Sequence, residues 1–345
     1  MHDGSLGALT MAQPSRPAIV GTLPRSLYLE TTNRCDSKCQ TCIRTFQTLE
    51  PPADLTLERV REIAAQFPTL DRVVLHGIGE PLLNPQIFDI VAYLKTRVAT
   101  VLFNSDAIGL TPGRTVRLIE SGLDEYRVSM DAATAATFRK LRGVDRFERV
   151  KINVARLVAL QREMGRTSPR VSLWFTASQA NVEELPAFVE LAAELGVAEV
   201  YVQRLVFNGL GLATDANALH GRLREREQAL LAEADALATR HGIAMRASGL
   251  TTPLASLHGG GDGARHWAGC QRPWTLAYVT ANGNVLPCCI SPWVAKDYRG
   301  LILGNAFTER FEAIWDGERY QRFRTDFESD TPPDPCRGCG RLWSI

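Results

Sequence analysis

The stretch that decides the fold is LETTNRCDSKCQTC, residues 29–42, in which three cysteines follow a short apolar run. Cys35, Cys39 and Cys42 are spaced Cys-x3-Cys-x2-Cys. Three thiolates on one loop can hold three irons of a cubane cluster and leave the fourth iron open to a small molecule. The same spacing also fits a zinc knuckle whose fourth ligand lies elsewhere, or thiols that bind no metal.

Around this loop the sequence alternates between β-rich runs and amphipathic helical patterns. Strands are expected at 27–31, 72–76, 100–104, 125–129, 170–176 and 199–204, with helices between them at 57–66, 86–96, 113–121, 145–164 and 182–195. Such an alternation predicts parallel strands joined by right-handed crossovers. Periodicity alone does not separate an open sheet from a barrel. Leucines at helical spacing predict one long helix over 214–241.

The composition of the 345 residues excludes several classes of protein. A net charge of +1, without a block of one sign, gives no reason to expect a nucleic-acid partner. No apolar run approaches the ~20 residues of a membrane span, and the first residues lack the apolar segment of a signal peptide. We therefore expect a cytoplasmic protein without a membrane partner, in which the clustered cysteines among the eight indicate metal binding instead of disulfides.

A second motif, GIGEPLL at residues 77–83, follows the second expected strand. Together with the cysteine loop one βα unit earlier, it resembles the radical S-adenosylmethionine (SAM) superfamily. The resemblance implies an α/β fold, a partial (β/α)6 TIM-like barrel, with a [4Fe–4S] cluster and SAM at the carboxyl ends of the strands. It also implies reductive cleavage of SAM to a 5′-deoxyadenosyl radical, which abstracts hydrogen from a substrate.

The resemblance assigns cofactor-binding roles to five residues. Gly79 and Glu80 match the motif that holds the amino group of SAM, and Arg142 matches an arginine that pairs with its carboxylate. Asn104 and Ser129 end the third and fourth strands, where they either contact SAM or form turns.

The sequence departs from the family pattern at two positions. Thr41 stands before the third cysteine of the loop, where the family commonly has a bulky residue, and Ile78 stands where glycine is frequent. Neither change removes a cluster ligand.

Five cysteines remain beyond the first loop, in a segment that differs in character from the barrel. Two β-rich runs, 274–280 and 285–289, flank Asn282-Gly283, which predicts a tight hairpin. The segment resembles the shortened SPASM domain ("twitch"), a small α+β auxiliary iron–sulfur domain. The spacing predicts an auxiliary [4Fe–4S] cluster with four protein ligands, Cys270, Cys288, Cys336 and Cys339, and leaves Cys289 spare. A structural zinc site is the alternative for the same four thiolates.

These patterns divide the chain into four parts. We expect a disordered leader at 1–24, the radical SAM barrel at 25–213, a helical connector and linker at 214–262, and the auxiliary domain at 263–345. The glycine-rich residues 257–263 mark the last boundary. Within the auxiliary domain, a helix is expected over about 307–327.

A cluster whose ligands all come from the protein suits electron transfer. We therefore expect a dehydrogenase that oxidises an alcohol carbon of a small molecule, such as a sugar or an aminocyclitol. The auxiliary cluster would accept one electron, as the resemblance to 2-deoxy-scyllo-inosamine dehydrogenase implies. Arg204, at the end of the sixth strand, is the candidate catalytic contact, and a flavodoxin or ferredoxin is the expected reductant.

Three other functions fit the same residues. One is epimerisation, with Cys289 as the hydrogen donor. Another is modification of a ribosomal peptide, although the roughly 25 residues before the first strand are too few for a leader-binding domain. The third is a zinc-binding scaffold without enzyme activity.

Overall fold

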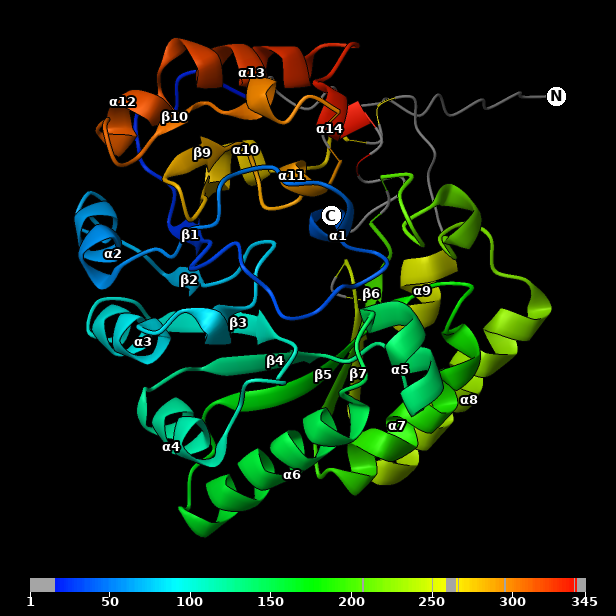
Figure 1. Cartoon of the computed structure of the whole chain (residues 1–345). Coiled ribbons are helices and arrows are strands. Elements are labelled where there is room, and N and C mark those ends of the chain that lie inside the picture. Colours follow the sequence, from blue (N-terminus) through cyan, green and yellow to red (C-terminus); the bar gives the residue numbers. More distant parts are fainter. Residues whose placement is uncertain are drawn as a thin grey trace, which may run out of the picture.

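The computed structural model describes residues 16–206, 208–249, 251–258, 265, 267–294, 296–337 and 339. Its centre is one sheet of ten strands in the order β10-β9-β8-β1-β2-β3-β4-β5-β6-β7 (Figure 1). Strands β1 to β7 are parallel and follow the chain order, so each is joined to the next by a crossover. This arrangement is the partial TIM-like barrel that the sequence predicts.

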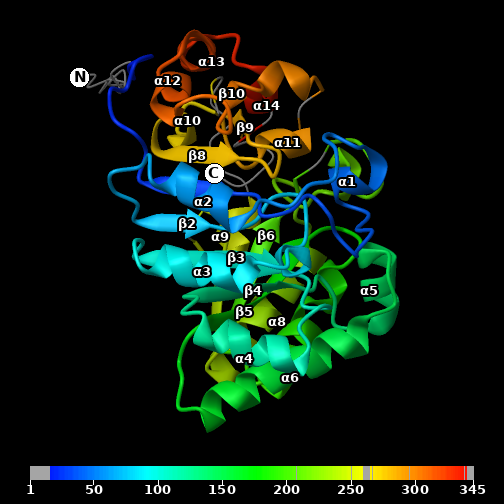
Figure 2. The same ribbon diagram turned by 60° about the vertical axis from the view of Figure 1, so that its left-hand side comes forward.

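The bounds of the barrel elements agree closely with the expected ones. The strands are β1 Ser26–Leu29, β2 Arg72–Val74, β3 Thr100–Ser105, β4 Glu125–Ser129, β5 Arg170–Ala177, β6 Glu199–Arg204 and β7 Ala244–Ala247. The helices are α1 Ile43–Phe46, α2 Leu57–Ala64, α3 Ile87–Lys95, α4 Pro112–Glu120, α5 Ala135–Arg142, α6 Phe147–Glu163, α7 Leu185–Glu194, α8 Glu225–His241 and α9 Pro253–His258. Figure 2 shows α2, α3, α4 and α6 on the outer side of the strands.

The two faces of the barrel strands differ in chemistry. In β4, Tyr126 and Val128 are buried among the helices, whereas the alternate residues are only half-buried and face the barrel interior. The barrel interior contains aromatic and charged side chains. The rings of Trp174 and Tyr201 stack with their centroids 4.0 Å apart, and the Arg127 guanidinium lies 4.8 Å from the centroid of the Trp174 ring. The apolar core therefore lies between sheet and helices, and the inner face is available for polar ligands.

The prediction of one helix over 214–241 is wrong for its first part. Gly221 has a φ of +69° and Arg224 caps the helix that starts at Glu225, so the chain turns where the leucine pattern continues. The structure also adds β7, which pairs with β6 and lies within the predicted connector. Most of the expected glycine linker, residues 259–263, lies outside the described residues.

The auxiliary domain contains the expected hairpin. Strands β8 Leu276–Val279 and β9 Asn284–Leu286 pair in antiparallel fashion, and Gly283 has the positive φ, +84°, that the tight turn requires. The short strand β10 Gly304–Asn305 follows β9 in the sheet. The helices are α10 Arg272–Thr275, α11 Ser291–Val294, α12 Phe311–Trp315, α13 Glu318–Glu328 and α14 Asp334–Arg337. The single helix expected over 307–327 is thus two helices, because the chain breaks at Asp316 and Gly317.

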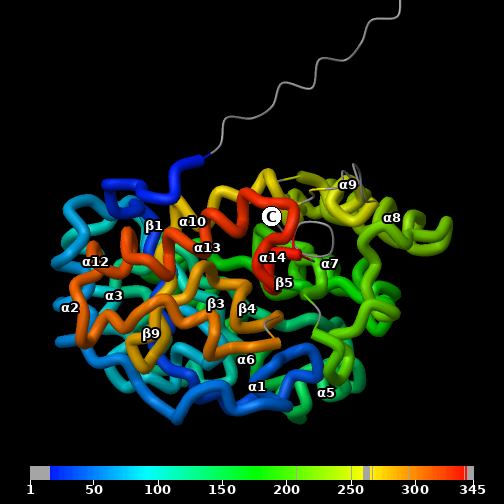
Figure 3. Tube along the Cα trace, turned by 90° about the horizontal axis from the view of Figure 1, so that it is seen from above, coloured from blue at the N-terminus to red at the C-terminus, as the bar shows by residue number. Residues whose placement is uncertain are grey.

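Strand β8 pairs in parallel with β1, from Ser26 opposite Leu276 to Leu29 opposite Val279. The auxiliary domain therefore extends the barrel sheet at its first edge, and Figure 3 places it opposite α7, α8 and α9. The Glu30 carboxylate, just beyond β1, accepts hydrogen bonds from the backbone N–H groups of Ile78 (2.8 Å) and Ala281 (3.1 Å). Burial raises the pKa of Glu30 to about 7.

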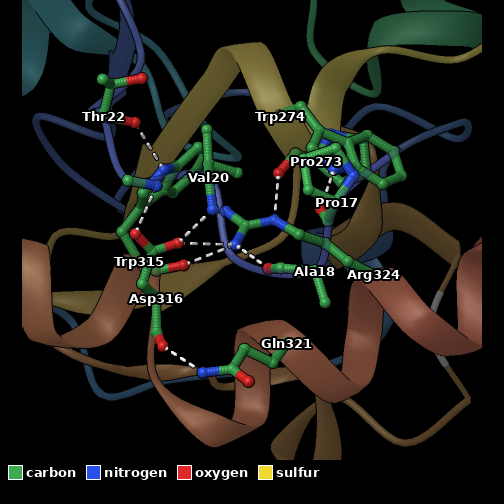
Figure 4. Close-up of polar contacts among 11 residues, drawn as sticks. Pro17, Ala18, Val20, Thr22, Pro273, Trp274, Trp315, Asp316, Gln321 and Arg324 are labelled. Carbon is green, nitrogen blue, oxygen red and sulfur yellow. Dashed lines mark hydrogen bonds and ion pairs between the residues drawn. The ribbon is translucent and has the colours of Figure 1, made fainter. Parts of the chain in front are cut away.

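Residues 16–24 differ from the predicted disordered leader, because they pack along the auxiliary domain (Figure 4). The guanidinium of Arg324, which is fully buried, donates to the carbonyls of Ala18, Pro273 and Trp315. The Asp316 carboxylate accepts from the backbone N–H groups of Val20 and Gly21, both at 2.8 Å. These bonds join the segment to three parts of the auxiliary domain. Residues 1–15 lie outside the described residues.

No helix among the described residues is both long enough and apolar enough to cross a membrane.

Replacing Arg324 with methionine should lower the free energy of unfolding by about 3 kcal/mol, because buried carbonyls and Asp316 lose their donor. Chemical denaturation of the purified protein measures the change. Arg322→Met is the matched control, since Arg322 lies on the same helix but its side chain is 86% exposed. An equal loss in both variants would contradict a central role for Arg324.

Candidate functional site

The three cysteines of the first motif lie on the loop that leaves the carboxyl end of β1. Cys35, Cys39 and Cys42 are free thiols and partly buried, and α1 begins directly after Cys42. Burial raises the pKa of Cys39 to about 12 and also raises the pKa values of Cys35 and Cys42. A metal that binds here must therefore displace protons from the thiols.

Backbone contacts with the end of α5 hold this loop in place. The N–H groups of Lys38 and Gln40 donate to the carbonyls of Arg142 (3.0 Å) and Leu141 (2.7 Å). Gly143 caps α5 with a φ of +69°, and a Cβ at this position would lie 2.2 Å from the Lys38 carbonyl oxygen. Only glycine therefore allows α5 to approach the cysteine loop this closely.

The Gly-Glu-Pro motif lies against the same segment from the other side. A Cβ on Gly79 would lie 2.0 Å from the carbonyl oxygen of Thr32, and the Glu80 N–H donates to the Arg34 carbonyl at 2.8 Å. The glycine is thus required for close backbone contact with the residues that lead into the cysteine loop. This packing leaves the SAM-binding role of Gly79 a prediction.

The Glu80 side chain is buried and fully engaged by the protein. It accepts hydrogen bonds from the Ser105 hydroxyl and the Asp106 N–H, both at 2.7 Å, and from the Leu82 N–H at 3.0 Å. Asp106 in turn accepts from the Ser37 hydroxyl at 2.7 Å, within the cysteine loop. Burial and the nearby Asp106 raise the pKa of Glu80 well above its usual value. Glu80 therefore links the Gly-Glu-Pro loop, the end of β3 and the cysteine loop.

Arg142 lies at the end of α5 beside the cysteine loop. Its guanidinium forms a buried ion pair with Asp131 at 2.9 Å, and Asp131 also accepts from the Thr176 N–H. Burial opposes the charge, but Cys39 and Asp131 hold the pKa of Arg142 above its ordinary value. Its Nε is buried and has no hydrogen-bond partner among the described residues. A fixed cation with a free N–H fits the carboxylate that the sequence assigns to it.

The other strand-end candidates have different surroundings. Asn104 lies on the inner face of β3 beside His76, and its Oδ1 is buried without a partner in the described part of the chain. Ser129 is half-buried at the end of β4, opposite Trp174. Arg204 donates from Nε to the Ser256 hydroxyl of α9 at 3.1 Å. These placements leave the roles of Asn104, Ser129 and Arg204 predictions.

Two functional candidates, Asp131 and Asp106, were not singled out from the sequence. Asp106 follows β3 directly and Asp131 is the second residue after β4, and each contacts an element of the cysteine site. A polar residue at the carboxyl end of a parallel strand was the signal that could have found them.

The four cysteines assigned to the second site line one cavity in the auxiliary domain. Most of its other walls are apolar; the lining residues besides the cysteines are Trp267, Arg272, Pro273, Pro287, Ile290, Ser291, Phe323, Phe327 and Pro335. The structure thus brings together Cys270, Cys288, Cys336 and Cys339 from three separate segments of the chain. Cys289 is not among the described residues that line this cavity, and its assignment as the spare thiol stays a prediction.

Both sites fit the expected cofactors. Three thiols beside a buried arginine with a free N–H suit a cluster that also binds SAM, and four thiols around one cavity suit a cluster with protein ligands only. S-adenosylmethionine and two [4Fe–4S] clusters are therefore the cofactors of this arrangement.

Comparisons with known proteins agree with this division. Residues 29–168 match the Radical SAM superfamily, and residues 270–340 match SPASM, an iron–sulfur cluster-binding domain. A PqqA peptide cyclase of Streptomyces rochei is 25% identical over 319 residues, 92% of this chain and 81% of the relative. An AdoMet-dependent heme synthase of Methanosarcina barkeri is also 25% identical, over 87% of this chain and 85% of the relative.

A solved structure shares the fold. The crystal structure of Streptococcus suis SuiB bound to S-adenosylmethionine superposes with a TM-score of 0.66 at 17% identity. The match covers 88% of this chain and 68% of SuiB. The barrel and the auxiliary domain of this chain therefore have the arrangement found in a SAM-binding protein.

Replacing Gly143 with alanine should displace the cysteine loop, because the new Cβ would collide with the Lys38 carbonyl. We expect anaerobically reconstituted protein to fall from about eight irons per chain toward about four. Gly165→Ala is the matched control, since Gly165 also has a positive φ (+61°) but a Cβ there meets nothing within 4 Å. Full iron content in Gly143→Ala would show that the loop tolerates the collision.

Replacing Arg142 with methionine should weaken SAM binding about 10- to 100-fold, which is the value of one charge-assisted interaction. Equilibrium binding of SAM to the reconstituted protein measures this loss. Arg139→Met changes an exposed arginine of the same helix and should leave the affinity unchanged. Equal affinities of the wild type and Arg142→Met for SAM would contradict the assignment of Arg142 to the SAM carboxylate.

The fold, the two thiol sites and the family matches support the same conclusion. Each site lies inside the segment that its family model matches. The chain carries a Radical SAM domain over residues 29–168 and a SPASM iron–sulfur cluster-binding domain over residues 270–340.

Proposed function

We propose that this enzyme oxidises its substrate by two electrons, with the auxiliary site as the electron acceptor. The observation that carries the proposal is the cavity lined by four thiols. Four thiolates satisfy all four irons of a cubane, so this site has no open position for SAM or substrate. Electron transfer is the function left to a cluster of this kind.

The two sites lie toward opposite ends of the paired strands β1 and β8. The cysteine loop follows the carboxyl end of β1. Cys270 precedes β8, and Cys288 follows β9, which runs antiparallel to β8, so both lie near the amino end. Four paired residues of β1 span about 13 Å. A substrate in the barrel interior would therefore lie between the two sites.

When bound, the SAM cluster and SAM supply a radical that removes one hydrogen atom from the substrate, and the auxiliary cluster then accepts the electron that leaves after deprotonation. The protein's own residues position these groups. Asp131 holds Arg142 for the SAM carboxylate, and Glu80 with Asp106 fixes the cysteine loop.

The substrate class that the relatives favour is a peptide. The expected oxidation of a sugar or aminocyclitol has no support among the relatives reported above, whose names are peptide cyclase and heme synthase. The inner face of the barrel offers the stacked rings of Trp174 and Tyr201, whereas the Arg127 guanidinium is paired with Glu125 at 2.6 Å. These rings suit a substrate with π faces, which aromatic peptide side chains provide.

Incubation with SAM, a reductant such as dithionite or reduced flavodoxin, and short peptides encoded beside the gene tests this proposal. We expect 5′-deoxyadenosine and a peptide lighter by about 2 Da, as loss of two hydrogens requires. Cys35→Ala should abolish both products. Cys270→Ala should retain 5′-deoxyadenosine but lose the oxidised peptide, because only the electron acceptor is removed.

A panel of sugars and aminocyclitols forms the second arm of the experiment. Oxidation of an alcohol in this panel, with every peptide unchanged, would replace the peptide proposal by the dehydrogenase first expected. Cys289→Ala separates epimerisation from oxidation, since an epimerase that uses this thiol would stop while an oxidase would continue. Failure to form 5′-deoxyadenosine under every condition would end the radical proposal itself.

A further inference from the structure

One charged side chain lines the cavity of the four auxiliary thiols. Arg272 begins α10, two residues after Cys270, and lies among the residues that surround this cavity. The other described lining residues are the four cysteines, one serine and apolar side chains, so Arg272 is the only cation among them. Its charge therefore lies in the wall that surrounds the four thiols.

The position of Arg272 also relates it to the barrel. Its charge acts most strongly on Cys289, then on Cys288, Cys270 and Cys339, and also on the Tyr28 hydroxyl. Tyr28 lies in β1 and contacts His76 edge to face, with ring centroids 5.7 Å apart. Arg272 thus acts on groups of the auxiliary site and of β1.

A second arginine, Arg16, lies near this site but is not among the residues that line the cavity. Arg16 donates to the carbonyl of Cys270 at 2.5 Å, but it also forms an ion pair with Glu328 at 2.7 Å. Its positive charge is therefore largely balanced by a carboxylate. Arg16 does not line the cavity, so its role is to hold the segment before α10.

The structure assigns Arg272 as the residue that raises the reduction potential of the auxiliary cluster. This inference rests on the proposed function, in which that cluster accepts an electron. A [4Fe–4S] cluster with four thiolates carries a net charge of −2 when oxidised and −3 when reduced, and net charge and surroundings set its potential. A cation held in an apolar wall stabilises the more negative state more strongly, because the local dielectric constant is low.

The test measures the potential of the auxiliary cluster alone. In the full chain carrying Cys35→Ala, Cys39→Ala and Cys42→Ala, the auxiliary cluster is the only one expected, with about four irons per chain. Electron paramagnetic resonance during a redox titration then follows the reduced cluster. At the wild-type midpoint potential, Arg272→Gln should lower the ratio of reduced to oxidised cluster at least tenfold, which is about 59 mV for one electron.

Two further variants separate charge from structure. Arg272→Lys keeps the positive charge and should remain close to the wild-type midpoint. Arg310→Gln removes the same charge from an exposed position at the start of α12, outside the cavity wall, and should change nothing. An unchanged midpoint in Arg272→Gln would overturn the assignment, as would an equal shift in Arg272→Lys.

Loss of the cluster is informative as well. If both Arg272→Gln and Arg272→Lys lose iron, Arg272 is required to assemble the site and does not tune its potential, so the assignment fails. If the chain with the three alanine substitutions and an unchanged Arg272 binds no iron, the auxiliary cluster is absent. The proposed function then fails as well. A cluster of normal iron content and unchanged potential overturns the role of Arg272 alone.

Discussion

The hydrogen bonding of β1 on both edges is the constraint on which the rest of the structure depends. One edge pairs with β2 of the barrel and the other with β8 of the auxiliary domain, both in parallel. The cysteine loop leaves the carboxyl end of this strand, and the auxiliary thiols gather toward its amino end. A four-residue strand therefore fixes the relative position of the two sites.

The buried groups around β1 are polar because the two sites need fixed geometry. Glu30 joins the Gly-Glu-Pro loop to the auxiliary hairpin through two backbone N–H groups. Glu80 and Asp106 join the same loop to β3 and to the cysteine loop. Such carboxylates are costly to bury, but each accepts several hydrogen bonds, which also rigidify the segments they connect.

The N-terminal segment gives the auxiliary domain further support. Its backbone groups form hydrogen bonds with Arg324 and Asp316, and Trp274 donates to the Pro17 carbonyl (Figure 4). The auxiliary domain has an apolar core of its own, in which Phe311, Trp315 and Phe327 are fully buried. The segment therefore adds polar contacts at the edge of this core.

The sequence by itself determined much of the barrel and the cysteine motifs from which the ligands of both sites are predicted. The βα alternation predicted six strands whose bounds the structure reproduces within two residues at either end, and Cys-x3-Cys-x2-Cys with Gly-Glu-Pro indicated the radical SAM superfamily. These features are local, because the hydrophobic period, the residues of a turn and the spacing of ligands each depend on residues that are close in the sequence. The hairpin at Asn282-Gly283 was predictable for the same reason.

Only the tertiary structure decided how these parts combine. No local pattern indicates that β8 pairs with β1 or that Arg272 lines the auxiliary cavity. Nor does one indicate that residues 16–24 accept a hydrogen bond from Arg324. The leucine pattern before Gly221 predicted a helix that the chain does not form, because the backbone turns there with a positive φ. Pairing between distant segments depends on which surfaces meet after the barrel forms, and that information is distributed over the whole chain.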